Sequence, residues 1–146
     1  MATMDLNSVT ISLAPDLLRT AEDLPQLRKE ILQQQADIVE PALKSGVTSS
    51  GLVDTGQLRD SIGRSTRKGG KEIIIGPSGE RAHKVSRSGR VQRLRNGHLG
   101  YIYEYGLPGR GIQPKRWMSN TISRVRGKTL NAAETVNDQF LKKHNL

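Results

Sequence analysis

The feature that most constrains the fold is a stripe of residues at helical spacing near the C-terminus. Its members recur at three- and four-residue steps and are Trp117, Thr121, Val125, Thr129, Ala132, Val136 and Phe140. This spacing places them on one face of an α-helix. Gly127 weakens the middle of that helix by up to about 1 kcal/mol relative to alanine. We therefore predict one long helix over residues 115–143, whose stripe must be buried against another element.

Composition limits the size of the core that this helix can join. The chain has 146 residues, of which 34% are apolar and 3% aromatic, against a usual apolar share of roughly 45–50%. The length predicts a single domain over residues 1–146. The core is expected to be thin, and either neighbouring copies complete it or the chain is a modest monomer with long solvated loops. Because cysteine is absent, disulfides and thiolate metal sites are excluded, which fits a reducing compartment.

The N-terminal third combines a weak strand pattern with a strong helix pattern. Residues 1–14 alternate weakly and are predicted to form a loose N-terminal arm, with an edge strand as the alternative. Residues 15–45 are predicted to be helical, because Asp23 and Gln26 have the spacing of a capping box ahead of an amphipathic stretch. Pro41 should kink or end this helix, since proline removes a backbone donor.

The middle of the chain, residues 55–106, is predicted to form a small antiparallel sheet. Residues 46–54 are small and polar and predict a loop before it. Residues 71–76 include three consecutive isoleucines, and a Gly-Gly pair favours a hairpin that joins them to residues 60–67. Three alternating tyrosines predict a further strand over residues 99–106. The predicted fold is therefore α+β, with an N-terminal amphipathic helix and a long C-terminal helix packed on the sheet.

Positive charge is concentrated in residues 59–98. Eleven Lys or Arg and three acids give this segment a net charge of +8 (11 − 3), against +9 for the whole chain. Residues 77–98 are predicted to be a long exposed loop, and its basic residues are Arg81, Lys84, Arg87, Arg90, Arg93 and Arg95. Three interpretations stay open: contact with nucleic-acid phosphates, contact with an acidic protein surface, or a solvated loop without a partner. The cations have no aromatic residues between them, so base stacking is poorly supported.

No pattern of residues predicts catalysis or cofactor binding. His83, His98 and His144 lack metal-ligand spacing, and no phosphate-loop motif is present. Glu104 is a single acid in an apolar segment, and we expect it to pair with Arg59 or Arg116. We therefore expect no metal, no cofactor and no enzymatic activity. Without a signal peptide or an apolar run of the ~20 residues that span a bilayer, the chain is expected to be soluble.

Three segments occur in an order that resembles a known family. They are residues 55–62 (TGQLRDSI), residues 101–106 (YIYEYG) and residues 114–118 (PKRWM). The order is similar to that in the neck and tail-completion proteins of long-tailed double-stranded-DNA bacteriophages, also described as head–tail joining proteins or putative tail components, and the likeness covers roughly residues 24–140. The chain departs from the family in two ways: its proline precedes the basic pair and tryptophan replaces phenylalanine, and its basic loop is longer.

The resemblance implies a non-enzymatic virion protein. It would form a homo-oligomeric ring of six or twelve copies at the head–tail junction, joining the tail to the head connector. Its partners would be the connector or adaptor, the tail tube or terminator, and genomic DNA in the channel, without a membrane. It would be synthesised in the cytoplasm of the bacterial host and end in the virion. A tail terminator that caps the tube is an alternative, and a small basic protein that binds DNA non-specifically is an alternative of another class.

The resemblance also implies which residues shape the assembly. These are Thr55, Gly56, Leu58, Arg59, Tyr101, Tyr103, Glu104, Tyr105, Gly106, Arg116 and Trp117. The first three would form the turn that enters the sheet, and the tyrosines would pack against the C-terminal helix or a neighbour, with Trp117 as an anchor. Glu104 and Arg116 would form an ion pair. The basic loop is expected to meet an acidic ring rather than DNA, because a channel that grips DNA tightly would impede its exit.

Overall fold

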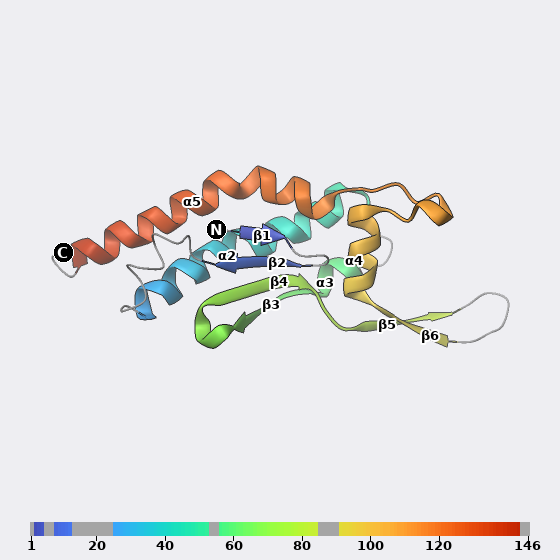
Figure 1. The fold of residues 1–146 in the computed structure, drawn as a ribbon, viewed down its shortest axis with the longest axis horizontal. Helices are drawn as coiled ribbons and strands as arrows, with labels where there is room; N and C mark the ends of the chain where they lie inside the picture. The colour runs from blue at the N-terminus through green and yellow to red at the C-terminus, as the bar shows by residue number, and fades with distance from the viewer. Residues whose placement is uncertain (1, 5–7, 13–24, 53–55, 85–90, 144–146) are drawn as a thin grey trace.

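The computed structural model describes residues 2–4, 8–12, 25–52, 56–84 and 91–143 (Figure 1). Three of the described helices exceed one turn, and the described strands form two antiparallel sheets. In chain order the elements are β1 (Ala2–Met4), β2 (Val9–Ser12), α2 (Pro25–Ser49), α3 (Gln57–Asp60), β3 (Ile62–Arg67), β4 (Glu72–Pro77), β5 (Glu80–Lys84), β6 (Val91–Arg95), α4 (Asn96–Tyr105) and α5 (Trp117–Lys143). Short 3₁₀ turns cover Lys68–Gly70 and Pro108–Arg110.

The main sheet has four strands in the order β1-β2-β4-β3, and every neighbouring pair is antiparallel. Val9 lies opposite Ile75 and Ile11 opposite Ile73, and these four side chains are buried. Helix α2 packs against β2, β3 and β4, while α5 runs along α2 and reaches β1. The helices thus cover one face of the sheet. The predicted α+β class is confirmed. The sheet is small and antiparallel, and the long C-terminal helix packs on the side of the sheet that the helices cover.

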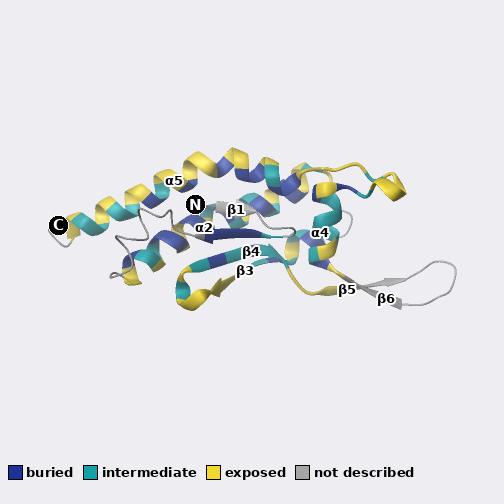
Figure 2. Cartoon of the chain, in the orientation of Figure 1, coloured by how far each residue is buried: buried dark blue, intermediate teal, exposed yellow. Residues whose placement is uncertain are grey.

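The largest packing surface joins α2 to α5, as the buried inner faces of both helices show (Figure 2). It includes small and polar residues as well as aliphatic ones. Gln35 donates a hydrogen bond from Nε2 to the carbonyl of Thr129 at 3.2 Å. The helices approach each other closely at Gly46, where a Cβ atom would lie 2.3 Å from Oγ1 of Thr121. Trp117 and Met118 are fully buried at the start of α5.

The predictions for the N-terminal third need correction, although the alternative of an edge strand in residues 1–14 agrees with β1. Residues 2–4 and 9–12 are strands β1 and β2 of the main sheet, and β2 is an inner strand rather than part of a loose arm. Pro41 does not end its helix, because α2 continues to Ser49 and takes up the start of the predicted loop. Pro41 is exposed, so the carbonyl that loses its helical partner faces water. The predicted helical residues 15–24 lie outside the described residues.

The hairpin of residues 60–67 and 71–76 is confirmed as β3 and β4, but the next two predictions need correction. The loop predicted over residues 77–98 contains a two-stranded ribbon, β5 paired with β6. The strand predicted over residues 99–106 is helix α4. Its buried residues, Asn96, Gly100 and Glu104, recur every four positions, which is the period of one helical face. This face, and not the alternation of the tyrosines, meets the rest of the protein.

Candidate functional site: a basic ribbon on a helical junction

Strands β5 and β6 form a ribbon that extends away from the body of the protein (Figure 1). The register pairs Glu80 with Arg95 at the base and Lys84 with Val91 at the far end of the described strands. Residues 80–95 hold six Lys or Arg and one acid, a net charge of +5 (6 − 1). Arg87 and Arg90 belong to this count and lie outside the described residues. Most of the basic loop predicted from the sequence is therefore displayed on a defined scaffold.

The ribbon receives little support from the hydrophobic core. Its principal contacts are between its own two strands and with α4. An isolated two-stranded hairpin is only marginally stable in water, so this ribbon gains little by folding alone. At its base Arg95 lies 3.7 Å from the carboxylate of Glu80, and the net positive charge of the segment favours contact with an anionic surface. The arrangement therefore suits electrostatic contact with a large partner rather than chemistry on a small substrate.

Asn96 fixes the base of the ribbon to the sheet. Its side chain is buried and donates from Nδ2 to the carbonyl of Ser78 at 2.8 Å, while its backbone N–H donates to the carbonyl of Gly79 at 3.0 Å. Ser78 in turn donates from its backbone N–H and its hydroxyl to the carbonyl of Ser61. Gly79 has a φ of 76°, which a glycine adopts without strain. The ribbon therefore leaves the body at a hydrogen-bonded joint.

Replacing Asn96 with alanine should weaken this joint. The carbonyl of Ser78 would lose its donor, which predicts a loss of about 1–2 kcal/mol in the free energy of unfolding. Urea denaturation followed by circular dichroism measures this change. Asn131→Ala on the exposed side of α5 is the matched control and should be neutral or slightly stabilising. Equal effects of the two substitutions would contradict the role given to Asn96.

The ribbon is connected to a junction between α4 and α5. In this junction residues of each helix make hydrogen bonds with the backbone or side chains at the end of the other. The carboxylate of Glu104 is buried and accepts hydrogen bonds from the backbone N–H groups of Met118 at 2.7 Å and Ser119 at 3.2 Å. The hydroxyl of Ser119 also donates to it. These amides belong to the first turn of α5. The N–H groups in the first turn of a helix have no carbonyl within the helix to accept their hydrogen bonds. A negative charge at this end is further stabilised by the helix dipole, so Glu104 caps α5 from another helix.

The carbonyls of α4 are satisfied in return by residues at the start of α5. Lys115 donates its N–H to the carbonyl of Tyr103 at 2.7 Å, and the indole Nε1 of Trp117 donates to the carbonyl of Gly100 at 3.0 Å. Between the helices the chain turns at Gly106, which has a φ of 78°. A Cβ atom there would lie 2.7 Å from the carbonyl oxygen of Ile112, so the turn requires glycine. Residues 100–119 consequently form one hydrogen-bonded unit.

The structure therefore corrects the predicted partner of Glu104. Within the described residues no salt bridge joins its carboxylate to Arg59 or Arg116. Arg59 pairs with Asp60 at 3.0 Å, and Arg116 has an exposed side chain with a left-handed backbone at φ 49°. The reason is geometric: a helical α4 aims Glu104 at the amide groups that begin α5, which a strand would not do.

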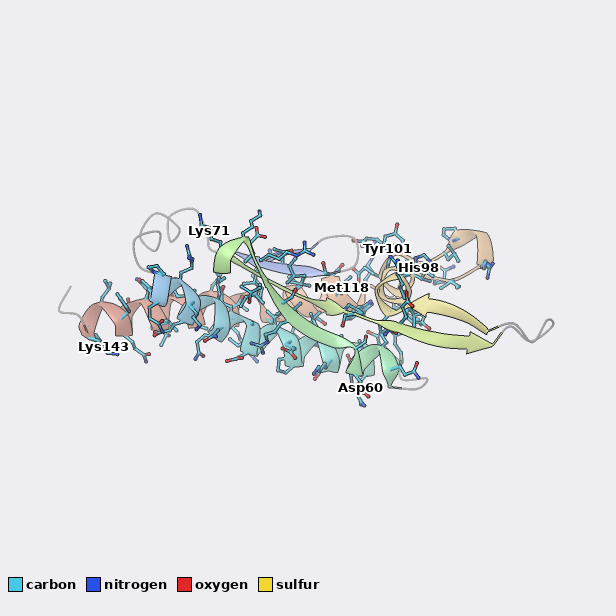
Figure 3. The ribbon with its side chains drawn as sticks, turned by 90° about the horizontal axis from the view of Figure 1, so that it is seen from below. Asp60, Lys71, His98, Tyr101, Met118 and Lys143 are labelled. Atoms are coloured by element: carbon cyan, nitrogen blue, oxygen red, sulfur yellow. The ribbon has the colours of Figure 1, made fainter. Side chains whose placement is uncertain are left out.

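The other predicted positions fall into distinct environments. Leu58 is buried in the core, Gly56 precedes α3 with a φ of 69°, and Thr55 lies outside the described residues. The rings of Tyr101 and Tyr105, one helical turn apart on α4, lie 4.9 Å from each other between their centroids. Tyr101 and His98 are at the end of the body from which the ribbon extends (Figure 3).

Tyr103 points differently from the other two tyrosines and packs against the core. The tyrosines therefore do not share one face, as the strand prediction required. Asn96 and Ser119 belong to the site and are not among the residues predicted from the sequence. The repeat of Asn96, Gly100 and Glu104 at four-residue intervals is a signal for Asn96, because it marks one face of a helix, and it gives no signal for Ser119.

The described residues contain no group of histidine and acidic side chains that could hold a metal ion. None of the helices in the described part of the chain is both long enough and apolar enough to cross a bilayer. Comparison with known proteins adds no assignment: no protein-family profile, curated protein or solved structure matches the chain.

Proposed function

We propose that this chain is a structural component of a ring at the head–tail junction of a long-tailed bacteriophage, where it joins the tail to the head connector. The observation that carries the proposal is the ribbon of residues 80–95, a segment of net charge +5 that extends from the body. A stable body with a charged extension is suited to docking between large assemblies. The order of the three sequence segments that resemble phage neck proteins supports the same function.

The ribbon is proposed to contact an acidic ring above or below its own. Complementary charge guides the encounter of two surfaces and fixes their register. Around a ring the contribution of each ribbon is repeated in every copy, so six copies would present +30 (6 × 5) from these segments alone. Exposed charges are screened within roughly 8–10 Å at physiological salt, so the contact should weaken as salt increases.

The two edges of the main sheet are proposed to contribute to contacts between subunits. Strand β3 is one edge, and its residues from Arg64 to Arg67 are exposed; β1 is the other edge. Edge strands present unpaired backbone groups to a neighbouring chain. Because the two edges differ, a contact that joins one to the other is head-to-tail, and such a contact forms a ring when the rotation between neighbours closes.

Removal of the ribbon tests this division of roles. A variant in which Asn-Gly replaces residues 81–94 should keep its helical circular dichroism signal, and its melting temperature should fall by only a few degrees. It should no longer co-sediment with virus particles from the cells that encode the chain. A second variant, in which glutamine replaces all basic residues of the ribbon, retains the ribbon's length and should fail in the same way. Normal co-sedimentation of both variants would contradict the proposed docking role.

The ring itself is tested by electron microscopy and mass photometry of the purified chain, alone and after addition to particles that lack it. The proposal predicts closed rings with six or twelve copies. A chain that remains monomeric under both conditions and does not associate with particles would contradict it.

A further inference from the structure

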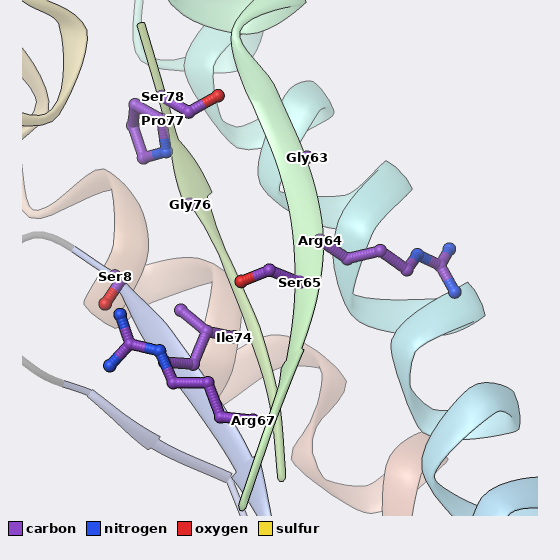
Figure 4. A pocket seen from close by; sticks show the side chains of 9 residues that line it. All are labelled: Ser8, Gly63, Arg64, Ser65, Arg67, Ile74, Gly76, Pro77 and Ser78. Carbon is purple, nitrogen blue, oxygen red and sulfur yellow. The ribbon is translucent and has the colours of Figure 1, made fainter. Parts of the chain in front are cut away.

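The open face of the main sheet contains a hollow of about 330 Å³ (Figure 4). Strands β3 and β4 form most of its wall, and Ser8, just before β2, completes it. The hollow lies on the face opposite α2, and Ser78 in its lining also belongs to the joint at the base of the ribbon. Its lining combines three serines, two glycines, two arginines and the apolar residues Ile74 and Pro77.

The hollow exists because two glycines lie opposite each other. Gly63 of β3 pairs with Gly76 of β4, and the buried Ile62 and Ile75 beside them point to the helices. The two glycines therefore belong to the open face. Neither has a positive φ, and a Cβ atom at Gly63 would meet nothing within 4 Å. The fold itself does not require glycine at residue 63, and a strand glycine often marks a site where a ligand or another backbone approaches closely.

Two arginines of β3 have different environments. Arg64 points to α2 and contacts Glu40 and Asp37, the latter at 2.9 Å. Partial burial lowers the pKa of Arg64, but its hydrogen bonds to these carboxylates outweigh that effect and raise the pKa above its ordinary value. Arg67 extends over the open face into the hollow (Figure 4). Its cross-strand neighbour Glu72 is bound by Lys68 at 2.8 Å.

Arg67 has no salt bridge or side-chain hydrogen bond with any described residue. The hydroxyls of Ser8 and Ser65 likewise have no hydrogen-bond partner in the part of the chain that the structure describes. Ser78 differs, because its hydroxyl already donates to the carbonyl of Ser61 at 3.1 Å. The hollow therefore offers a guanidinium group and two hydroxyls that are free to donate, and none of the described residues that line it carries a carboxylate.

We propose that this hollow binds a backbone phosphate of nucleic acid, and we call Ser8, Gly63, Ser65, Arg67 and Gly76 the phosphate cradle. A guanidinium group donates two parallel hydrogen bonds to phosphate oxygens, and serine hydroxyls are common donors to the same oxygens. The bare glycine floor allows a bulky phosphodiester to approach the sheet. Because the lining residues that the structure describes include no aromatic side chain, contact should be independent of base sequence.

The first test is binding of the full chain to a short duplex DNA, measured by fluorescence anisotropy over a series of salt concentrations. Arg67→Gln should reduce affinity about tenfold. It should also reduce the slope of log affinity against log salt by about 0.9, the value for one phosphate contact. Arg126→Gln, at an exposed position on α5, removes the same charge and is the matched control. It should change affinity much less.

The substitution Gly63→Thr distinguishes binding in the phosphate cradle from a general effect of positive charge on DNA affinity. The new side chain fills the hollow without altering net charge, so DNA affinity should again fall about tenfold. The melting temperature should hold or rise, because threonine favours strands and its Cβ meets no other atom. Affinities of Arg67→Gln and Gly63→Thr that match that of Arg126→Gln would overturn the proposal.

Amide chemical shifts identify the source of the phosphate. Duplex DNA and inorganic phosphate should both perturb the amides of Gly63, Ser65 and Gly76, and DNA should do so at lower concentration. A response to inorganic phosphate without a response to DNA, or an equal response to a polyglutamate peptide, would overturn the assignment to nucleic acid. The measurement needs no ring and no virus particle, so it can fail or succeed independently of the proposed function.

Discussion

Replacing Glu104 with alanine should reduce the free energy of unfolding by about 3 kcal/mol, because hydrogen bonds to a charged group are worth ~1.5–3 kcal/mol and their loss leaves buried donors unpaired. The carboxylate accepts the N–H groups of Met118 and Ser119 and the hydroxyl of Ser119. Glu104→Gln keeps one acceptor oxygen and should lose about half as much. Chemical denaturation of the two variants measures both values.

The control for Glu104 is Arg116, its partner in the predicted ion pair. Arg116→Asn removes the cation and places at φ 49° a residue that tolerates this conformation and caps helices well. It should be neutral or slightly stabilising. A loss at Arg116 as large as that at Glu104 would instead favour an ion pair between them and contradict the helix-capping role.

Gly46→Ala should cost about 2–3 kcal/mol, although alanine is the better helix former. The added Cβ would lie 2.3 Å from Oγ1 of Thr121, so α2 and α5 would have to separate. The second substitution of a double-mutant cycle, Thr121→Ala, removes that oxygen. In its background, Gly46→Ala should cost much less, since the next atom of the protein is the carbonyl oxygen of Trp117 at 3.4 Å.

Thermal and urea unfolding of the four proteins in the cycle give the coupling energy between the two sites. Gly127→Ala, at an exposed position of α5 where a Cβ meets nothing within 4 Å, is the control for helix propensity alone and should be stabilising by up to about 1 kcal/mol. Additive effects at Gly46 and Thr121 would show that the helices do not meet where the structure places them.

The elements that could be predicted from the sequence have strong local signals. Helix α5 follows from a stripe that runs almost unbroken from Trp117 to Phe140. The hairpin of β3 and β4 follows from Gly69-Gly70 beside three isoleucines. Helix α4 was mistaken for a strand, because alternating tyrosines imitate the strand period while its buried face consists of an asparagine, a glycine and a glutamate. A search for apolar periodicity cannot detect such a face.

Only part of the candidate site can be predicted from the sequence, because some of its contacts are made by backbone groups. Glu104 is conspicuous in the sequence as a single acid, but its partners are backbone amides of Met118 and Ser119, and backbone groups leave no signature in a sequence. The positive charge of residues 80–95 was evident, yet its strands were not, because serine, glycine and arginine outnumber strand formers there. The phosphate cradle depends on the cross-strand register of Gly63 and Gly76, which only the folded sheet reveals.

Quantitative mass spectrometry of virus particles purified from cells that encode this chain tests the central proposal most directly. The account predicts that the chain is present in intact particles at a fixed ratio of six or twelve copies per connector, and that it is lost when residues 81–94 are replaced by Asn-Gly. Purified, infectious particles that contain no copies of the chain would contradict it.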